Sequence, residues 1–202
     1  MGKTHKLITI KGVFEFVHMT KPRFVACMLA GLFAIAIAVI FLLCFYNPYP
    51  LYFREEIEFA GEKYGVSPAL VASVIFAESS FRTDAKSSRG AVGLMQLLPS
   101  TAQWLCARQG ESFSEEMLTN PLYNIELGTY YLSYLFEKFE NETAVLAAYN
   151  AGEGNVRLWL LNTTYSADGE GLTTTPYKET NEYIKKVKKA EKHYLKIMNN
   201  EQ

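Results

Sequence analysis

The sequence predicts a mainly α-helical protein, in which a helical domain with a minimal β element follows one transmembrane helix. Two observations lead to this fold class. Residues 24–46 contain no charged side chain, and signals that start and stop helices recur along the rest of the chain. The chain has 202 residues, of which 49% are hydrophobic and 20% are charged, so one compact domain fits beside the membrane segment.

The apolar segment 24–46 is long enough to cross a membrane, because an α-helix rises about 1.5 Å per residue and the hydrocarbon core is ~30 Å thick. A buried core helix is the alternative, but a core helix of that length usually has a polar face. Five basic residues precede the segment, and only two follow it within residues 47–66. The positive-inside rule therefore makes residues 1–23 a cytoplasmic arm and places the rest of the chain outside.

We expect the apolar segment to be an uncleaved signal anchor. The apolar stretch of a cleaved signal peptide is usually about 7–15 residues long, and a small-x-small site follows it, which is missing here. Lipidation at Cys44 is disfavoured because the bulky Leu43 precedes it. Residues 47–53 are then a short linker that contains Pro48 and Pro50, and residues 54–202 form the external domain.

Charge and cysteine content exclude several classes of function. The 20 basic and 21 acidic residues give a formal charge of −1, which argues against nucleic acid as a partner. Three cysteines cannot make a disulfide-rich scaffold or a structural zinc site, and the three histidines are scattered. Cys106 is the only cysteine after residue 46, and we expect it to be a small buried hydrophobe.

The external domain divides into helices at recognisable signals. Residues 55–64 are amphipathic and end at Gly65. Ser67-Pro68 combines an N-cap residue with proline at the first helical position, which predicts a helix to about residue 79. Gly90 and Gly93 indicate a loop over 87–98 with a small hairpin. The remaining elements are expected as helices beginning at 99, over 121–139, 143–150, 155–161 and 179–198, with a polar loop over 162–176.

Glu78 is the most informative residue of this domain. It ends a helix whose only polar side chain over 69–77 is Ser73, and a helix that is apolar all round is expected to be buried. Helical spacing puts Glu78 on one face with Val71, Val74 and Ile75. Apolar neighbours and the negative end of the helix dipole should both raise the pKa of its carboxyl, as a general acid requires. The alternative is that Glu78 extends from the last turn into water.

Four ordered motifs are highly specific when they occur together. They are Glu78-Ser79-Ser80-Phe81, the stretch 85–102 with Gly93-Leu94-Met95-Gln96, the stretch 120–128 leading into Ala148-Tyr149-Asn150-Ala151-Gly152, and Pro176-Tyr177-Lys178-Glu179-Thr180 with Tyr183. Over about residues 54–198 the chain resembles the lytic transglycosylases of the soluble-murein-transglycosylase type, glycoside hydrolase family 23, which also contains goose-type lysozyme. Leu98 and Glu153 depart from the family pattern, where methionine and proline are frequent.

This resemblance implies a lysozyme-like fold with Glu78 as the sole catalytic acid and base. It also implies that polar residues line a sugar groove, namely Ser87, Gln96, Thr101, Tyr149, Asn150, Glu179 and Tyr183. Amide side chains such as Gln96 and Asn150 can each donate and accept hydrogen bonds, as acetamide groups need. No metal and no cofactor is implied.

Several of these positions also have a purely structural interpretation. The Tyr149 phenol is expected to hydrogen-bond near the reacting centre or to orient the acid, and the alternative is a core tyrosine. Gly90 and Gly93 either let backbone approach a glycan or simply form a turn. Glu179, at the start of a helix, is either a groove residue or only a favourable partner of the helix dipole.

A single carboxylate is enough if the substrate takes part in the reaction. Ordinary glycosidases use two carboxylates, but Asp84 and Asp168, the only aspartates, belong to no motif. By resemblance, Glu78 protonates the departing oxygen and then acts as base on the C6 hydroxyl of N-acetylmuramic acid, whose 2-acetamido group stabilises the oxocarbenium-like centre. Intramolecular closure of the 1,6-anhydro ring benefits from high effective molarity.

We therefore expect a membrane-anchored bacterial lytic transglycosylase that cleaves the β-1,4 bond between N-acetylmuramic acid and N-acetylglucosamine. It is expected to be a single-pass protein of the cell membrane that acts on peptidoglycan strands outside, with no nucleic-acid partner. A protein partner in an envelope complex is left open. One alternative is a hydrolase similar to goose-type lysozyme, and the other is a non-catalytic wall-binding scaffold of such a complex.

Overall fold

The computed structural model describes residues 21–45 and 48–199. The chain divides into two compact units, Met1–Pro48 and Tyr49–Gln202. Most of the predicted cytoplasmic arm, residues 1–20, lies outside the described residues, as do residue 46 of the predicted anchor and residue 47 of the predicted linker.

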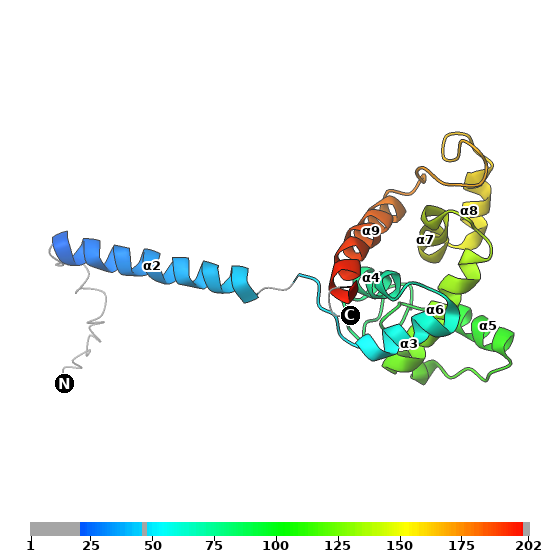
Figure 1. The fold of residues 1–202 in the computed structure, drawn as a ribbon, viewed down its shortest axis with the longest axis horizontal. Coiled ribbons are helices and arrows are strands. Elements are labelled where there is room, and N and C mark those ends of the chain that lie inside the picture. The colour runs from blue at the N-terminus through cyan, green and yellow to red at the C-terminus, as the bar shows by residue number, and fades with distance from the viewer. Residues whose placement is uncertain (1–20, 46–47, 200–202) are drawn as a thin grey trace, which may run out of the picture. The chain divides into compact units, whose positions relative to one another are not determined.

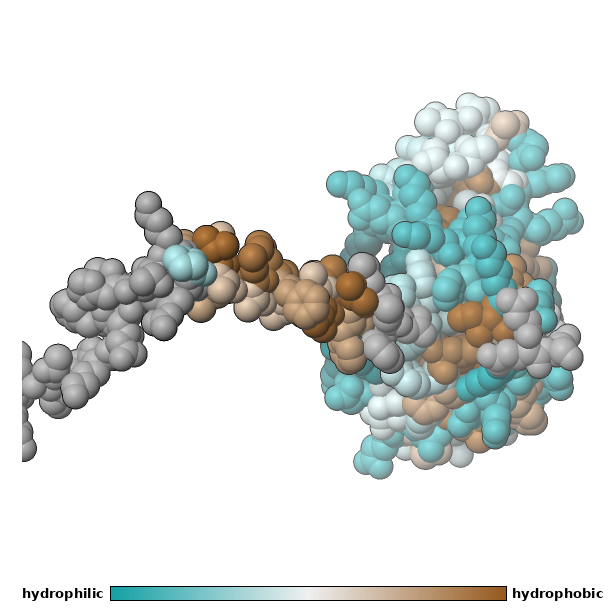
Figure 2. All heavy atoms as spheres, turned by 60° about the vertical axis from the view of Figure 1, so that its left-hand side comes forward, coloured by the Kyte–Doolittle hydropathy of each residue, from teal (hydrophilic) through white to brown (hydrophobic). Residues whose placement is uncertain are grey.

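The first unit contains one helix, α2 (Lys21–Phe45), among its described residues. Its segment Phe24–Phe41 has a mean hydropathy of 2.8, and its side chains are exposed rather than buried in the protein. Figure 2 shows apolar side chains along this helix. By length and composition α2 is therefore able to cross a membrane, and its exposed side chains distinguish it from the buried apolar helix of a core.

The second unit confirms the mainly α-helical fold class. Its described residues form seven α-helices and one 3₁₀ helix, and β structure among them is limited to two isolated antiparallel bridges, Lys86–Val92 and Val92–Leu97. These bridges lie where the sequence predicted a small hairpin. The elements are α3 (Arg54–Tyr64), α4 (Pro68–Glu78), α5 (Pro99–Gln109), η2 (Glu115–Thr119), α6 (Pro121–Phe136), α7 (Glu142–Ala151), α8 (Glu153–Leu160) and α9 (Lys178–Asn199).

The core forms around α4, whose residues 69–75 are all buried. Fully burying one large aliphatic side chain stabilises a fold by roughly 1.5–3 kcal/mol, so this helix is a main source of stability. α9 packs along α4 (Figure 1) and buries its apolar stripe, which includes Ile184, Val187 and Tyr194. The lysines at 185, 186, 189 and 192, which alternate with these positions, are exposed. α4 is thereby held along its length, and Glu78 is held at its end.

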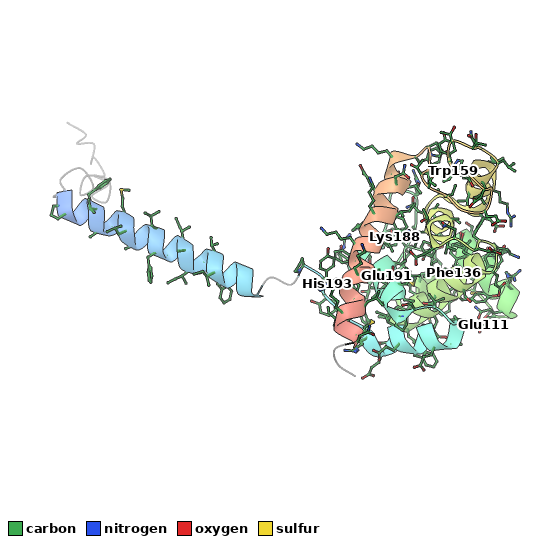
Figure 3. The ribbon with its side chains drawn as sticks, turned by 45° about the horizontal axis from the view of Figure 1, so that its top comes forward. Glu111, Phe136, Trp159, Lys188, Glu191 and His193 are labelled. Carbon is green, nitrogen blue, oxygen red and sulfur yellow. The ribbon has the colours of Figure 1, made fainter. Side chains whose placement is uncertain are left out.

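The C-terminal half of α9 also fixes the first residues of the second unit. Tyr194 donates a hydrogen bond of 2.7 Å to the carbonyl oxygen of Pro50, and the rings of Tyr49 and His193 stack with centroids 4.4 Å apart. Lys188, labelled with His193 in Figure 3, donates to the hydroxyl of Thr143 at 2.6 Å. α9 therefore connects the segment before α3 with the start of α7.

Helix boundaries follow the predicted signals with instructive differences. Ser67 occupies the N-cap position of α4, but its side chain makes no capping hydrogen bond. Asn120 and Asn141 do cap their helices, accepting from the backbone N–H groups of Tyr123 and Ala144 at 3.1 Å. The 3₁₀ helix η2 was not predicted, because so short an element carries no hydrophobic periodicity.

A second cluster of buried residues lies between α5 and α6 and supports the loop over 87–98. Cys106 is fully buried there, as predicted, with its sulfur 3.1 Å from the Tyr123 hydroxyl. Asn124 of α6 is also fully buried and accepts from the backbone N–H of Met95 at 2.7 Å. It donates to the carbonyl oxygens of Val92 and Leu118, so one amide fixes the loop on the helix.

Candidate active site

A cleft of about 620 Å³ opens at the C-terminal end of α4. Glu78 lines it together with six of the seven predicted groove residues, namely Ser87, Gln96, Thr101, Tyr149, Asn150 and Glu179. Four separate elements contribute these side chains: the loop over 87–98, α5, α7 and α9. The fold thus brings residues from 78 to 179 to one surface.

Glu78 is partly exposed at the edge of the cleft. Burial is the largest effect on its carboxyl and raises the pKa to about 7, and the nearby charge of Glu179 also raises it. The interaction with Tyr183 and the positive charge of Lys186 act in the opposite direction. A carboxyl with such a pKa is protonated in a large fraction of molecules at neutral pH, so it can donate a proton.

Tyr183 does not line the cleft; it is buried, with 8% of its surface exposed. Its hydroxyl makes no hydrogen bond of normal geometry within the described part of the chain, yet it lies near enough to lower the pKa of the Glu78 carboxyl. The structure therefore places Tyr183 beside the Glu78 carboxyl rather than on the surface of the cleft.

Tyr149 is both a cleft residue and a packing residue. Its hydroxyl donates to the carbonyl oxygen of Met95 at 2.8 Å, which ties α7 to the loop over 87–98. Burial, followed by the negative charge of Glu78, holds the pKa of the phenol well above its usual value. The phenolic proton is therefore used in the hydrogen bond to Met95, and the Tyr149 oxygen can only accept a hydrogen bond from a ligand.

Gln96 and Asn150 offer opposite hydrogen-bonding groups. The amide nitrogen of Gln96 donates to the carbonyl oxygens of Ala85 at 3.0 Å and Gly93 at 2.9 Å, which leaves the amide oxygen for a ligand. The amide oxygen of Asn150 accepts from the hydroxyl of Thr180 at 2.9 Å, which leaves the amide nitrogen. The cleft thus presents an acceptor on the loop and a donor on α7.

Ser87 and Glu179 are held by local contacts. The Ser87 hydroxyl accepts from the backbone N–H of Ala91 at 3.0 Å and closes the turn at the cleft margin. The Glu179 carboxylate lies 3.8 Å from the guanidinium of Arg89, with both side chains largely exposed, so this ion pair is worth at most about 1 kcal/mol. Thr101 lies in the first turn of α5, where it lines the cleft.

Sequence reasoning missed Tyr131, which also lines the cleft. Its ring lies 5.2 Å from that of Tyr149, and burial raises the pKa of its hydroxyl to about 12. The residue belongs to an aromatic-rich stretch of α6, where a tyrosine at helical spacing is indistinguishable from a core position. Ala151 and Gly152 also line the cleft.

Other candidate chemistry lies outside the cleft. Within residues 21–45 and 48–199, no group of three or more His, Cys, Asp or Glu side chains is placed to hold a metal ion. Asp168 caps its own turn, accepting from the backbone N–H groups of Glu170 and Gly171 at 2.9 Å. Neither Asp168 nor Asp84 lines the cleft, so its carboxyl groups come from Glu78 and Glu179.

Fold and site together define a lysozyme-like helical domain in which one carboxyl of raised pKa faces an open cleft with amide groups on both sides. Residues 55–170 match the family model described as "Transglycosylase SLT domain". The chain belongs to this family.

Individual relatives agree with this assignment. The chain is 38% identical over 126 residues to the soluble lytic murein transglycosylase of Escherichia coli K12. This match covers 60% of this chain and 19% of that protein. It is 32% identical over 166 residues to the membrane-bound lytic murein transglycosylase C of Histophilus somni, covering 70% of this chain and 46% of the relative. The chain thus spans less than half of either relative.

A solved structure shares the fold. The inactive mutant of lytic transglycosylase Slt from Pseudomonas aeruginosa, in which a glutamate is replaced by glutamine, superposes with a TM-score of 0.67 at 32% sequence identity. The match covers 75% of this chain and 25% of that one.

Proposed function

We propose that this protein is a peptidoglycan lytic transglycosylase in which Glu78 is the single general acid and base. The raised pKa of Glu78 at the edge of the cleft carries the proposal. An acid that is protonated near pH 7 can donate its proton to the glycosidic oxygen as the bond breaks. The relatives named above, which are lytic murein transglycosylases, support the choice of substrate.

The amide groups of the cleft suit a 2-acetamido sugar. An acetamide offers one N–H donor and one carbonyl acceptor, and the cleft offers the Gln96 oxygen and the Asn150 nitrogen. Each group is fixed by its other hydrogen bonds, so little side-chain freedom is lost on binding. We propose that this pair orients the acetamido group of N-acetylmuramic acid, whose carbonyl oxygen then supports the developing positive charge.

The second half of the reaction uses the same carboxyl. After proton transfer, the Glu78 carboxylate accepts the proton of the sugar's C6 hydroxyl, while the C6 oxygen bonds to C1 and closes the 1,6-anhydro ring. The Glu78 proton is thereby restored, and no water is consumed. A pKa of about 7 suits both directions of transfer because neither protonation state is strongly disfavoured at neutral pH.

A lysozyme-like hydrolase is the alternative, since Glu179 brings a second carboxyl to the cleft. Its side chain is about three quarters exposed and lies beside Arg89, which suits surface binding better than activation of a sequestered water. We therefore expect Glu179→Gln to retain the product and to affect affinity only. Reducing ends that the wild type releases and this variant does not would favour the two-carboxylate hydrolase.

We further propose that α2 anchors the protein in the cytoplasmic membrane with the second unit outside. Its apolar length supports the anchor, and the excess of basic residues before residue 24 supports the orientation. Membrane fractionation, followed by protease digestion of intact spheroplasts, tests both points. Digestion of the Tyr49–Gln202 unit from outside is the expected result, and its protection would reverse the orientation.

Purified peptidoglycan, digested with the wild-type protein and with Glu78→Gln, tests the chemistry. Mass spectrometry of the soluble products is expected to find 1,6-anhydro ends with the wild type and no release with the variant. Reducing ends would instead indicate a hydrolase. If both proteins sediment with peptidoglycan and neither releases fragments, the protein is a wall-binding scaffold and the enzymatic proposal is wrong.

A further inference from the structure

A second, smaller cavity of about 240 Å³ adjoins the cleft, because Thr101 and Tyr131 line both. The other residues around it are Ser100, Trp104, Tyr134 and Glu153. Neither Trp104 nor Tyr134 belongs to the motifs that predicted the groove, and Glu153 stands at a departure from the family pattern. The cavity therefore extends the cleft with side chains that have no role in the proposed reaction.

Trp104 gives this cavity a rigid apolar wall. Its side chain projects from α5, and 40% of the residue is exposed, whereas Trp159 is 7% exposed. The indole meets the ring of Tyr134 edge-on at 5.0 Å, and the guanidinium of Arg108 lies 5.4 Å from its centroid. These contacts fix the ring before any ligand binds. A flat ligand that covers the exposed part of the indole therefore costs the protein little conformational entropy.

Polar groups lie beside this apolar wall. One oxygen of Glu153 accepts from the Tyr134 hydroxyl at 3.0 Å, and the other accepts from two nitrogens of Arg157 at 2.9 and 2.6 Å. The oxygen bonded to Tyr134 therefore retains a lone pair for a further donor. Ser100 and Thr101, which both carry a hydroxyl group, line the same cavity. An aromatic face next to a fixed carboxylate and two hydroxyls matches a sugar ring, which has an apolar C–H face and a rim of hydroxyl groups.

We infer that the cavity lined by Trp104, Tyr134 and Glu153 is an additional sugar subsite, which binds one ring of the glycan strand beyond those held in the cleft. The inference rests on the proposed function, because it needs a polysaccharide in the cleft. A cavity of about 240 Å³ has room for one sugar ring. A cationic peptide side chain fits less well, since Arg108 and Lys138 already lie over the Tyr134 ring at 4.9 and 5.1 Å.

Intrinsic fluorescence offers a direct test, because the chain contains two tryptophans and the second, Trp159, is buried. The full-length protein in detergent, carrying Glu78→Gln to prevent turnover, is titrated with N-acetylglucosamine oligomers of two to six sugars. Long oligomers are expected to shift or quench the emission, and the disaccharide is expected to leave it unchanged. Adding Trp104→Phe should remove the optical response while calorimetry still detects binding.

The affinities of Trp104 variants for long and short oligomers test the subsite separately from the rest of the cleft. Trp104→Ala is expected to weaken binding of the six-sugar oligomer about tenfold and to leave binding of the disaccharide unchanged. Trp104→Phe retains an aromatic face and should lose less than threefold. Phe59→Ala is the matched control, since Phe59 is an exposed aromatic residue of α3 that lines neither cavity, and it should bind both oligomers normally.

The outcomes distinguish this inference from the proposed function. Equal affinity of the Trp104→Ala variant and its parent for the long oligomer would overturn the subsite, although peptidoglycan cleavage by wild type would still support the enzyme. An optical response that persists in Trp104→Phe would overturn it as well. If no oligomer binds and wild type releases no fragments, the subsite and the proposed function both fail.

Discussion

The ammonium group of Lys186 donates a hydrogen bond of 2.7 Å to the carbonyl oxygen of Ala77, the residue before Glu78. The same group lies 5.3 Å from the centroid of the Phe76 ring. The last turn of α4 has no basic residue of its own, so α9 supplies the positive charge that favours a helix C-terminus. This charge also lowers the pKa of the Glu78 carboxyl. One lysine therefore serves both the end of the helix and the candidate acid.

Lys186→Met is expected to raise the pKa of Glu78 further above its present value of about 7. The initial proton transfer needs the protonated acid, so the fall in kcat/KM on the alkaline side should move to higher pH. The other groups that act on the Glu78 carboxyl, Tyr183 and Glu179, are unchanged. A pH–rate profile of peptidoglycan cleavage measures the shift.

Lys185→Met is the matched control, because it removes a neighbouring exposed charge of α9 that does not appear among the groups acting on Glu78. Its profile should coincide with that of the wild type. A Lys186→Met profile that also coincides would show that this lysine has no electrostatic influence on the acid.

Glu78→Gln is expected to stabilise the fold at alkaline pH. The pKa of the carboxyl rises from 4.5 to about 7 on folding, so the folded state binds the proton more tightly and ionisation opposes folding. Below pH ~4.5 the carboxyl is protonated in both the folded and the unfolded state, so it does not lower the stability of the wild type. Above pH ~7 its stability has fallen by up to ~3 kcal/mol, at 1.36 kcal/mol per unit. Urea unfolding at pH 4 and pH 8 should show a gain for Glu78→Gln only at pH 8.

Gly90 and Gly93 provide a matched pair of substitutions. Both have a left-handed backbone, with φ of 82° and 85°, so alanine costs about 1–2 kcal/mol of strain at either position. A Cβ at Gly90 meets open space, whereas a Cβ at Gly93 would lie 2.3 Å from the amide nitrogen of Asn124 and from the Leu118 carbonyl oxygen. We therefore expect Gly93→Ala to lower the free energy of unfolding by at least ~2 kcal/mol more than Gly90→Ala, as measured by denaturant titration. Equal costs would contradict this packing argument.

Tyr183→Phe is expected to leave the stability of the fold nearly unchanged and to raise the pKa of the Glu78 carboxyl. The buried hydroxyl interacts with the Glu78 carboxyl and has no other hydrogen-bond partner in the described part of the chain, so its removal should cost the fold little. The free energy of unfolding is expected to stay the same or to rise slightly. Because the hydroxyl lowers the pKa of Glu78, its removal should raise that pKa and move the alkaline limb of the pH–rate profile to higher pH. A large loss of stability would show that the hydroxyl is structurally bonded.

Local signals were sufficient for most of the helices and for the position of Glu78. The start signal Ser67-Pro68 and the apolar run that follows marked α4 and placed Glu78 at its end, which the structure bears out. Contacts between distant segments could not be predicted from these signals. The two loop carbonyls that occupy the Gln96 amide exist only once the loop has closed. Tyr131 reaches the cleft only because α6 packs beside α7, and the Gly93 side of the loop approaches Asn124 rather than the cleft.

The burial of Cys106 has a consequence for the biogenesis of the second unit. No other cysteine lies within residues 47–202, and its thiol is enclosed between α5 and α6, out of reach of another chain. Folding of this unit thus requires no oxidant and no disulfide isomerase. It is equally suited to a reducing and to an oxidising compartment, and its native state is insensitive to changes in thiol redox potential.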